Sequence, residues 1–412
     1  MADLTDIAGR PPRSRDAKVI GLVSGAHFVS HVYMLVLPPL FAFVRADYAV
    51  SYAELGFAIA AFNMVSLVFQ PPAGFLADRF GARRLLIGGL VLSGVGVIVA
   101  GLVPSYWALV GGMALMGLAN TTYHPADYSI LSHSISGKRI GYAFSVHTFF
   151  GTFGMAIAPV TMLFLTRLWG WHSAFVGASV FGFGMALVLL LNRDALPEGT
   201  AASSTPHSPV ASGRVGWRLL FSRAIVRNVA FFVILSMATG GISGFSIVAL
   251  GALYGTPLAT ANFALSAYLL FNAAGVLAGG YVATRAHRHE FIASAGFMGS
   301  GALILLVGLV NLGAGVLVMV MALSGFLNGV IQPSRDMIVR AATPPGSFGK
   351  VFGFVSTGFN LAGIAAPLLF GWLMDQAHPR SIFLVVAGLT LLSLPLLTGK
   401  PAQAPHTPIA AD

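Results

Sequence analysis

The chain has 412 residues, of which 56% are hydrophobic and only 9% are charged. Soluble proteins carry roughly 25% charged residues, so this composition excludes a soluble globular chain. Cysteine is absent, which excludes disulfide bonds and thiolate metal sites, and the formal net charge is +10.

Twelve apolar runs follow one another along the chain, and each is long enough to cross a bilayer as a helix, which takes about 20 residues. The first run follows a basic segment and has about 25 residues. A cleaved signal peptide has an apolar region of only about 7–15 residues, so no cleavable signal is expected. The runs are 19–43, 53–73, 85–103, 106–132, 140–166 and 172–192, then 224–250, 259–283, 291–312, 314–339, 350–374 and 381–397.

The basic residues are unevenly distributed between the runs. If the N-terminus lies inside, the outside loops hold only Arg45, Arg167 and Arg380 of the 23 Lys and Arg residues, and Arg335 lies within a run. Because Lys and Arg accumulate in cytoplasmic loops, this distribution predicts cytoplasmic N- and C-termini. The positive charge is then a topology signal, and no nucleic-acid partner is expected.

The longest polar interruption, 193–223, divides the runs six and six. It is rich in proline, serine and alanine, which predicts a cytoplasmic linker. We therefore expect an N-terminal six-helix bundle over 18–192 and a C-terminal one over 224–397. The polar ends, 1–17 and 398–412, are expected to be cytoplasmic tails.

A segment of the fourth run recurs in the tenth run, 208 residues later. Met113-Ala-Leu-Met-Gly-Leu-Ala-Asn-Thr-Thr-Tyr-His-Pro125 corresponds to Met321-Ala-Leu-Ser-Gly-Phe-Leu-Asn-Gly-Val-Ile-Gln-Pro333. Glycine and alanine match easily among apolar helices, but asparagine and proline in register favour an internal duplication over chance. Two repeated halves with a binding site between them near the midplane is the architecture of many secondary transporters.

The connection between the second and third runs is Gly74-Phe-Leu-Ala-Asp78-Arg79-Phe-Gly81-Ala-Arg83-Arg84. It predicts a short basic turn, so both helices enter the membrane from the same side. The string resembles the signature loop of the major facilitator superfamily, Gly-x-Leu-Ala-Asp-Arg-x-Gly-x-Arg-Arg, which lies between that family's second and third helices. The resemblance to the superfamily covers nearly the whole chain.

This resemblance implies an all-α integral membrane fold of twelve helices in two pseudo-symmetric six-helix bundles. It implies a secondary transporter in the cell inner membrane that works by alternating access, rather than an enzyme or a sensor. We expect a small-molecule substrate, protons and the lipid bilayer as partners, a monomeric state, and the proton gradient as energy source with no cofactor.

The resemblance also implies a gating role for the charged loop. In the superfamily the loop arginine often pairs with an acidic group at the inner end of the fourth helix, which here is Asp127. Asp78 would cap the start of the eleventh run, where a carboxylate meets the positive end of the helix dipole. In the second half Thr284 replaces the aspartate, and Asp336 with Arg285 is the expected counterpart. The gating residues are Asp78, Arg79, Gly81, Arg83, Arg84, Asp127, Arg285 and Asp336.

Histidines gather at one depth in the first half of the chain. An ionisable group inside the membrane costs about 2.5–3.5 kcal/mol, so each needs a reason. His27 and His31 share one helix face, as do His124 and Asp127, and His147 lies at a similar depth. Each histidine could simply bond a backbone carbonyl, but four together favour a proton-coupling and anion-sensing cluster, because histidine changes charge near neutral pH. Asp127 is thus either a gate latch or a proton site.

Further polar residues are candidate substrate ligands, and no metal ion is expected. His27-x3-His31 has the spacing of a metal site, which His124 and His147 could complete in principle, but its own run holds no acidic residue. The candidate substrate ligands are Tyr33, Asn120, Asn272, Asn328, Gln332 and Arg335.

The first run, Gly25-Ala-His-Phe-Val-Ser-His-Val-Tyr-Met-Leu-Val-Leu-Pro-Pro-Leu40, and Tyr123-His-Pro125 resemble the fosmidomycin-resistance-like branch of the superfamily. Gly154-x3-Ala158-Pro159 partly resembles the fifth-helix motif of drug–proton antiporters. These resemblances imply proton-coupled export of a small polar, anionic or drug-like compound. Coupled or facilitated uptake of an organic anion is the alternative.

Overall fold

The computed structural model describes residues 14–135, 139–196, 221–285, 289–341 and 348–397. Every element in these ranges is helical, and none of them is a strand. The first half holds α1 (Ser14–Met34), η2 (Pro38–Leu40), α2 (Phe41–Tyr48), α3 (Tyr52–Phe80), α4 (Ala82–Leu102), α5 (Tyr106–Ser134), α6 (Ile140–Leu191) and η3 (Arg193–Ala195). The second half holds α8 (Arg223–Tyr254), α9 (Leu258–Arg285), α10 (His289–Leu309), α11 (Ala314–Ala341), α12 (Phe348–Asp375), α13 (Pro379–Leu392) and α14 (Leu394–Leu397).

The predicted all-α membrane fold is confirmed. Among the described residues, 10 helical stretches are long and apolar enough to cross a membrane. One of them, α6, has 52 residues and bends at Gly170, whose φ of 80° is a conformation that favours glycine, so it makes two crossings. Adding α5, with 29 residues, gives the twelve crossings that the sequence predicts.

Two predicted boundaries are wrong. The run 19–43 is not one helix, because α1 ends at Met34 and the chain restarts as a short helix at Pro38, where proline is tolerated in a first turn. The basic turn is shorter than predicted, because α3 continues to Phe80 and α4 begins at Ala82. Gly81, with φ of 90°, alone separates the two helices.

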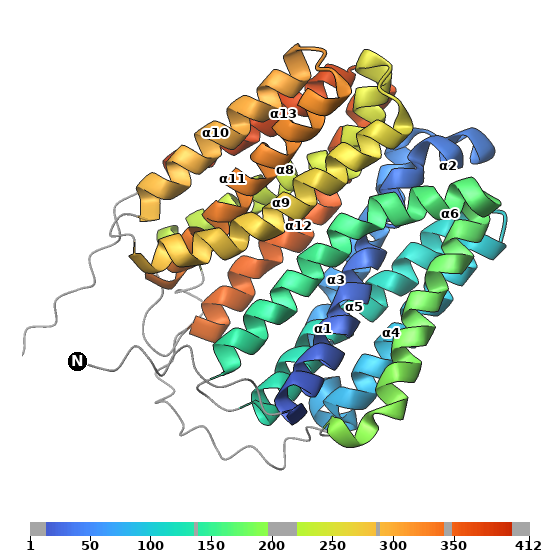
Figure 1. Cartoon of the computed structure of the whole chain (residues 1–412), viewed down its shortest axis with the longest axis vertical. Coiled ribbons are helices and arrows are strands. Elements are labelled where there is room, and N and C mark those ends of the chain that lie inside the picture. Colours follow the sequence, from blue (N-terminus) through green and yellow to red (C-terminus); the bar gives the residue numbers. More distant parts are fainter. Residues whose placement is uncertain (1–13, 136–138, 197–220, 286–288, 342–347, 398–412) are drawn as a thin grey trace, which may run out of the picture.

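The helices form two groups, which Figure 1 shows as α1–α6 in blue to green and α8–α13 in yellow to red. In the first group α1 packs on α6, α3 on α5, and α4 on both α5 and α6. The second group repeats these pairings, with α8 on α12, α9 on α11, and α10 on both α11 and α13. Residues 1–13, 398–412 and most of the linker 193–223 lie outside the described residues, whereas 14–17, predicted as the end of the first tail, begin α1. The domain limits stay predictions.

The repeat extends to individual atoms at the crossings of α3 with α5 and of α9 with α11. A side chain on Gly117 would collide with the carbonyl of Phe62, and one on Gly325 with the carbonyl of Tyr268. These glycine carbonyls, 208 positions apart, also accept equivalent hydrogen bonds. Ser66 donates to that of Gly117 at 2.8 Å, and Asn272 donates to that of Gly325 at 3.3 Å.

The two halves meet tightly at the end where α3 begins and α12 ends, which we call the closed end. The backbone N–H groups of Tyr52 and Ala53 donate to the two carboxylate oxygens of Asp375, each at 2.8 Å. Gly56 lies against the carbonyl of Pro367, so these antiparallel helices touch without intervening side chains. At the opposite end, which we call the basic end, α3 ends, α4 and α6 begin, and Arg83, Arg84 and Arg139 lie.

Candidate functional site

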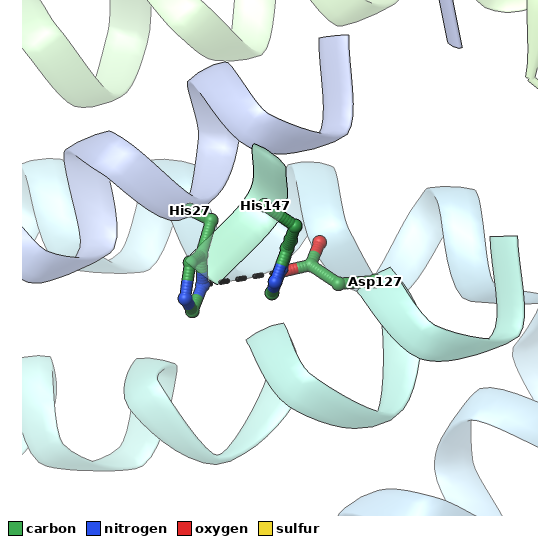
Figure 2. A group of neighbouring side chains, drawn as sticks. All are labelled: His27, Asp127 and His147. Carbon is green, nitrogen blue, oxygen red and sulfur yellow. Dashed lines mark hydrogen bonds and ion pairs between the residues drawn. The ribbon is translucent and has the colours of Figure 1, made fainter. Parts of the chain in front are cut away.

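Side chains from three helices converge on one carboxylate in the first half of the chain. Asp127 comes from α5, His27 from α1 and His147 from α6, as Figure 2 shows. All three are buried, with Asp127 0% exposed. A hydrogen bond of 2.9 Å joins Nε2 of His147 to Oδ2 of Asp127, and Nδ1 of His27 lies 3.4 Å from the same oxygen.

Two more histidines complete a group that we call the histidine cluster: His27, His31, His124 and His147 around Asp127. The ring of His27 stacks on that of His147, with 3.7 Å between centroids and an interplanar angle of 19°. The ring of His31 lies 4.4 Å and that of His124 5.2 Å from the ring of His27. The predicted gathering of the four histidines is therefore what the structure shows, although their role is untested.

Glycine on α6 makes room for the cluster. A Cβ atom on Gly151 would lie 2.6 Å from Nε2 of His27 and 3.2 Å from Nε2 of His31. One turn further along, Gly154 lies against the carbonyl of Phe28. The close approach of α1 to α6, and hence the contact between His27 and His147, depends on these small residues.

Several polar atoms of the cluster are buried without a hydrogen-bond partner. They include Oδ1 of Asp127 and Nδ1 of His27, His31 and His124, and the 3.4 Å contact of His27 with Asp127 is not aligned as a hydrogen bond. Leaving a buried polar atom unpaired costs about 1–3 kcal/mol. His31 and His124 are less completely buried than His27 and His147. Such an arrangement is suited to exchanging protons or cations.

The predicted gating residue Arg83 is held at the start of α4. Nη1 of Arg83 donates to the carbonyls of Arg193 at 2.8 Å and Leu196 at 3.0 Å, which joins α4 to η3. Asp127 is paired with histidines, and its role as a gate latch or a proton site stays a prediction. The gating roles of Arg79, Gly81, Arg83 and Arg84 stay predictions. The side chains of Asp78, Arg285, Arg335 and Asp336 lie outside the described residues.

Amide side chains form a second polar group in the other half. Asn272 donates to Oδ1 of Asn328 at 3.0 Å, and Gln332 donates to Oδ1 of Asn272 at 3.2 Å. In the repeat, Gln332 stands where His124 stands in the first half and Asn328 where Asn120 stands. Asn120 is partly buried on α5.

Tyr33 makes contacts within the first bundle. Its hydroxyl donates to the carbonyl of Ala178 at 3.0 Å and accepts from the N–H of Gly182 at 2.7 Å. Both partners belong to the second segment of α6. The hydroxyl therefore holds α1 against α6, and its predicted role as a substrate ligand has no support from these contacts.

A cavity of about 400 Å³ lies between the two halves, toward the basic end. It does not contain the histidines, but Phe144 in its wall packs edge-on against Tyr128 at 5.2 Å, and Tyr128 lies 5.7 Å from the rings of both His124 and His147. Sequence reasoning missed these wall residues, although Ser145, Thr148 and Thr152 share one helix face. The walls are Phe144, Ser145, Thr148, Phe149 and Thr152 of α6, Ala273, Val276, Leu277, Gly280 and Tyr281 of α9, and Pro333 of α11.

Comparison with known proteins places this geometry in a family context. The profile described as Major Facilitator Superfamily matches residues 23–255 and 229–412. The fosmidomycin resistance protein of Escherichia coli K12 is 22% identical over 382 residues, which is 91% of each chain. A protein of Cupriavidus necator named "Probable sulfoacetate transporter SauU" is 21% identical over 408 residues, 90% of each chain.

A solved structure has the same fold. It is a bacterial homologue of the human lysosomal transporter Spinster in an inward-facing and occupied conformation, with a TM-score of 0.75 and 12% identity. The alignment covers 94% of this chain and 97% of the other.

Proposed function

Because the chain belongs to the major facilitator superfamily, and is thus a multi-pass membrane transporter of small solutes and not an enzyme, we propose that it moves a small organic anion across the cytoplasmic membrane in a proton-coupled cycle. The observation that carries the proposal is the buried carboxylate of Asp127 among four imidazoles. The working unit is a monomer with both termini in the cytoplasm.

Proton coupling is supported by the chemistry of the histidine cluster. Histidine is the side chain whose charge changes between about pH 5 and 8, and a carboxylate in contact with two imidazoles can exchange protons with them. His31 and His124 are the partly exposed members, so they are suited to exchange protons between the cluster and water.

An anionic substrate is supported by the sign of that charge and by the relatives. Each proton that the cluster gains adds positive charge, which attracts an anion. One full-length relative is named for sulfoacetate and another for fosmidomycin resistance. The hydroxyls of Ser145, Thr148 and Thr152 in the cavity wall could supply neutral hydrogen bonds to the same ligand.

Two directions of transport are each supported by one observation. The name of the resistance relative supports export, which is our main candidate. The cluster supports uptake, because binding is reciprocal: if a proton strengthens anion binding, the anion strengthens proton binding, and the two travel together. Export in exchange for protons requires the opposite relation, in which a bound proton weakens the binding of the anion.

Alternating access is supported by the contrast between the two ends. The bonds of Asp375 to the start of α3 join the halves at the closed end, whereas a cavity lined by α6 and α9 lies toward the basic end. With the basic end in the cytoplasm, this conformation faces inward. Rocking of the halves would open the closed end.

The role of Asp127 can be tested in liposomes that enclose a pH-sensitive dye. Addition of fosmidomycin or sulfoacetate is expected to drive a proton flux, and the sign of the flux gives the direction. Asp127→Asn should abolish this flux, because the amide cannot take up a proton. Asp47→Asn is the matched control, since Asp47 lies at the closed end, where it contacts Trp171 and His172. An unchanged flux in Asp127→Asn would refute proton coupling through the cluster.

Growth of cells that overproduce the protein tests direction independently. Increased tolerance to phosphonates and other small toxic anions, lost with Asp127→Asn, supports export. Increased sensitivity supports uptake and overturns the export candidate.

A further inference from the structure

The three most buried members of the histidine cluster have the composition of a metal site. Two imidazole nitrogens and one carboxylate oxygen, from His27, His147 and Asp127, all lie within 4.8 Å of one another. Zinc sites that keep one position open commonly use three protein ligands of these types. Magnesium and calcium prefer sites made of oxygen atoms alone, so the donor set favours a transition metal.

Two of the three donor pairs have separations close to those of a zinc site. Two ligand atoms at the usual zinc distances of about 2.0–2.2 Å are about 3.3 Å apart when the geometry is tetrahedral. Nδ1 of His27 lies 3.4 Å from Oδ2 of Asp127, and Nε2 of His147 lies 2.9 Å from it. An ion that replaces the hydrogen bond of His147 would widen that pair by a few tenths of an ångström, while the stacked rings turn to aim their nitrogens at it.

Unpaired atoms around the triad offer further donors. Oδ1 of Asp127 and the Nδ1 atoms of His31 and His124 are buried without hydrogen-bond partners. Either histidine could supply a fourth ligand, since their rings lie 4.4 Å and 5.2 Å from that of His27. Both are partly exposed and mark the side from which an ion could reach the triad.

We propose that His27, Asp127 and His147 form a zinc-binding site, with His31 or His124 as the fourth ligand, and that bound zinc blocks transport by occupying the proton-coupling atoms. The block rests on the proposed function, whereas the binding does not. The sequence alone predicts no metal site, because the apolar run of the His-x3-His pair holds no acidic residue and the carboxylate comes from α5.

Zinc binding can be measured on the whole purified protein in detergent, without a histidine tag and after treatment with a chelator. The absence of cysteine removes thiolates as competing ligands. Titration with zinc chloride against a chromogenic chelator should give one tight site per chain. Loss of a ligand in Asp127→Asn or His147→Gln should weaken this site at least tenfold. His133→Gln should bind as the parent does, because that exposed histidine lies outside the cluster and bonds the carbonyl of Ser129 on its own helix.

Cobalt(II) gives a second reading that does not depend on affinity. A tetrahedral site with nitrogen and oxygen ligands should produce visible absorption bands in the parent and in His133→Gln, and these bands should disappear in Asp127→Asn. Size-exclusion profiles that match the parent show which variants are folded, and His27→Gln replaces any variant that is not. Equal binding by the parent and all ligand variants, or no tight site in the parent, would overturn the proposal.

The inhibition of transport by zinc is measured separately from zinc binding. Zinc added to liposomes at concentrations that fill the site should stop the substrate-driven proton flux of the parent. Binding without a block would overturn only the regulatory part and would count against proton coupling through the cluster. A flux that depends on Asp127 in a protein without a tight zinc site would overturn the metal site and leave the proposed function standing.

Discussion

Gly151 determines how closely the histidines of α1 approach α6. Any side chain at this position would enter the ring of His27, whose stacked partner His147 lies on the same helix as the glycine. Protein interiors are packed densely enough that one extra methyl group is felt. The geometry of the cluster therefore depends on a residue that contributes no polar atom to it.

We expect Gly151→Ala to disturb the cluster at its centre. Overpacking of a buried site costs about 1–3 kcal/mol, so the midpoint of thermal unfolding should fall and the substrate-driven proton flux should decrease. Gly141→Ala is the control on the same helix, because no atom lies within 4 Å of the added carbon. It should leave the flux unchanged, and its stability should stay equal or rise slightly, since alanine favours a helix by about 1 kcal/mol over glycine. Equal behaviour of the two variants would contradict the packing argument.

At the scale of the elements, the crossing of α3 with α5 and the crossing of α9 with α11 have the same packing arrangement. Gly117 and Gly325 let the facing backbones touch, and a polar side chain from the partner helix bonds each glycine's carbonyl. Small residues at helix crossings are the usual means of packing in a membrane, where no hydrophobic effect separates helix from lipid.

Gly117→Ala and Gly325→Ala should therefore destabilise the protein to similar extents, by about 1–3 kcal/mol each. Gly111→Ala on α5 and Gly315→Ala on α11 are matched controls, because the added carbon meets nothing within 4 Å in either case. Thermal unfolding in detergent measures all four. A large loss in one half with none in the other would argue that the repeated geometry is not equally important in both bundles.

Helical periodicity explains what could be predicted about the cluster and what could not. The spacings of His27 with His31 and of His124 with Asp127 place each pair on one helix face, so a polar cluster was predictable. Which residues of the cluster contact one another was not predictable. Whether Asp127 meets His147 or a basic residue of the signature segment depends on how α1, α5 and α6 pack together, and Gly151 controls the approach of α1 to α6. Local backbone breaks, such as that before Pro38, also interrupt runs that hydropathy alone makes continuous.

At the scale of the molecule, the two halves are held together at the closed end by a carboxylate on a helix N-terminus. The carboxylate of Asp375 accepts hydrogen bonds from the first two N–H groups of α3. The hydroxyl of Ser51 accepts one from the third, that of Glu54. Free N–H groups at a helix start need such partners. The residues that meet here are more than 300 positions apart in sequence, so no local pattern predicts their contact.

Asp375→Asn should shift the protein toward a conformation open at the closed end. Loss of a charged cap costs about 1 kcal/mol, which is roughly a fivefold change in population. Because the chain has no cysteine, a single Thr148→Cys probe in the cavity wall reports access from the basic end. A membrane-impermeant maleimide should label it several-fold more slowly in the Asp375→Asn background than in the Asp47→Asn background. Equal rates would contradict a gating role for Asp375.

The antiparallel pairing of α3 and α12 has a thermodynamic consequence. Asp375 at the end of α12 caps the start of α3, and Asp78 of the signature segment is predicted to cap α12. In that arrangement, tilting the pair would break the hydrogen bonds of one aspartate while those of the other form. The two conformations would then differ little in free energy. Because the two conformations would be close in free energy, binding of a single proton or anion would be enough to shift the equilibrium between them. Neutralising either aspartate should then bias the balance in opposite directions, and neutralising both should restore it.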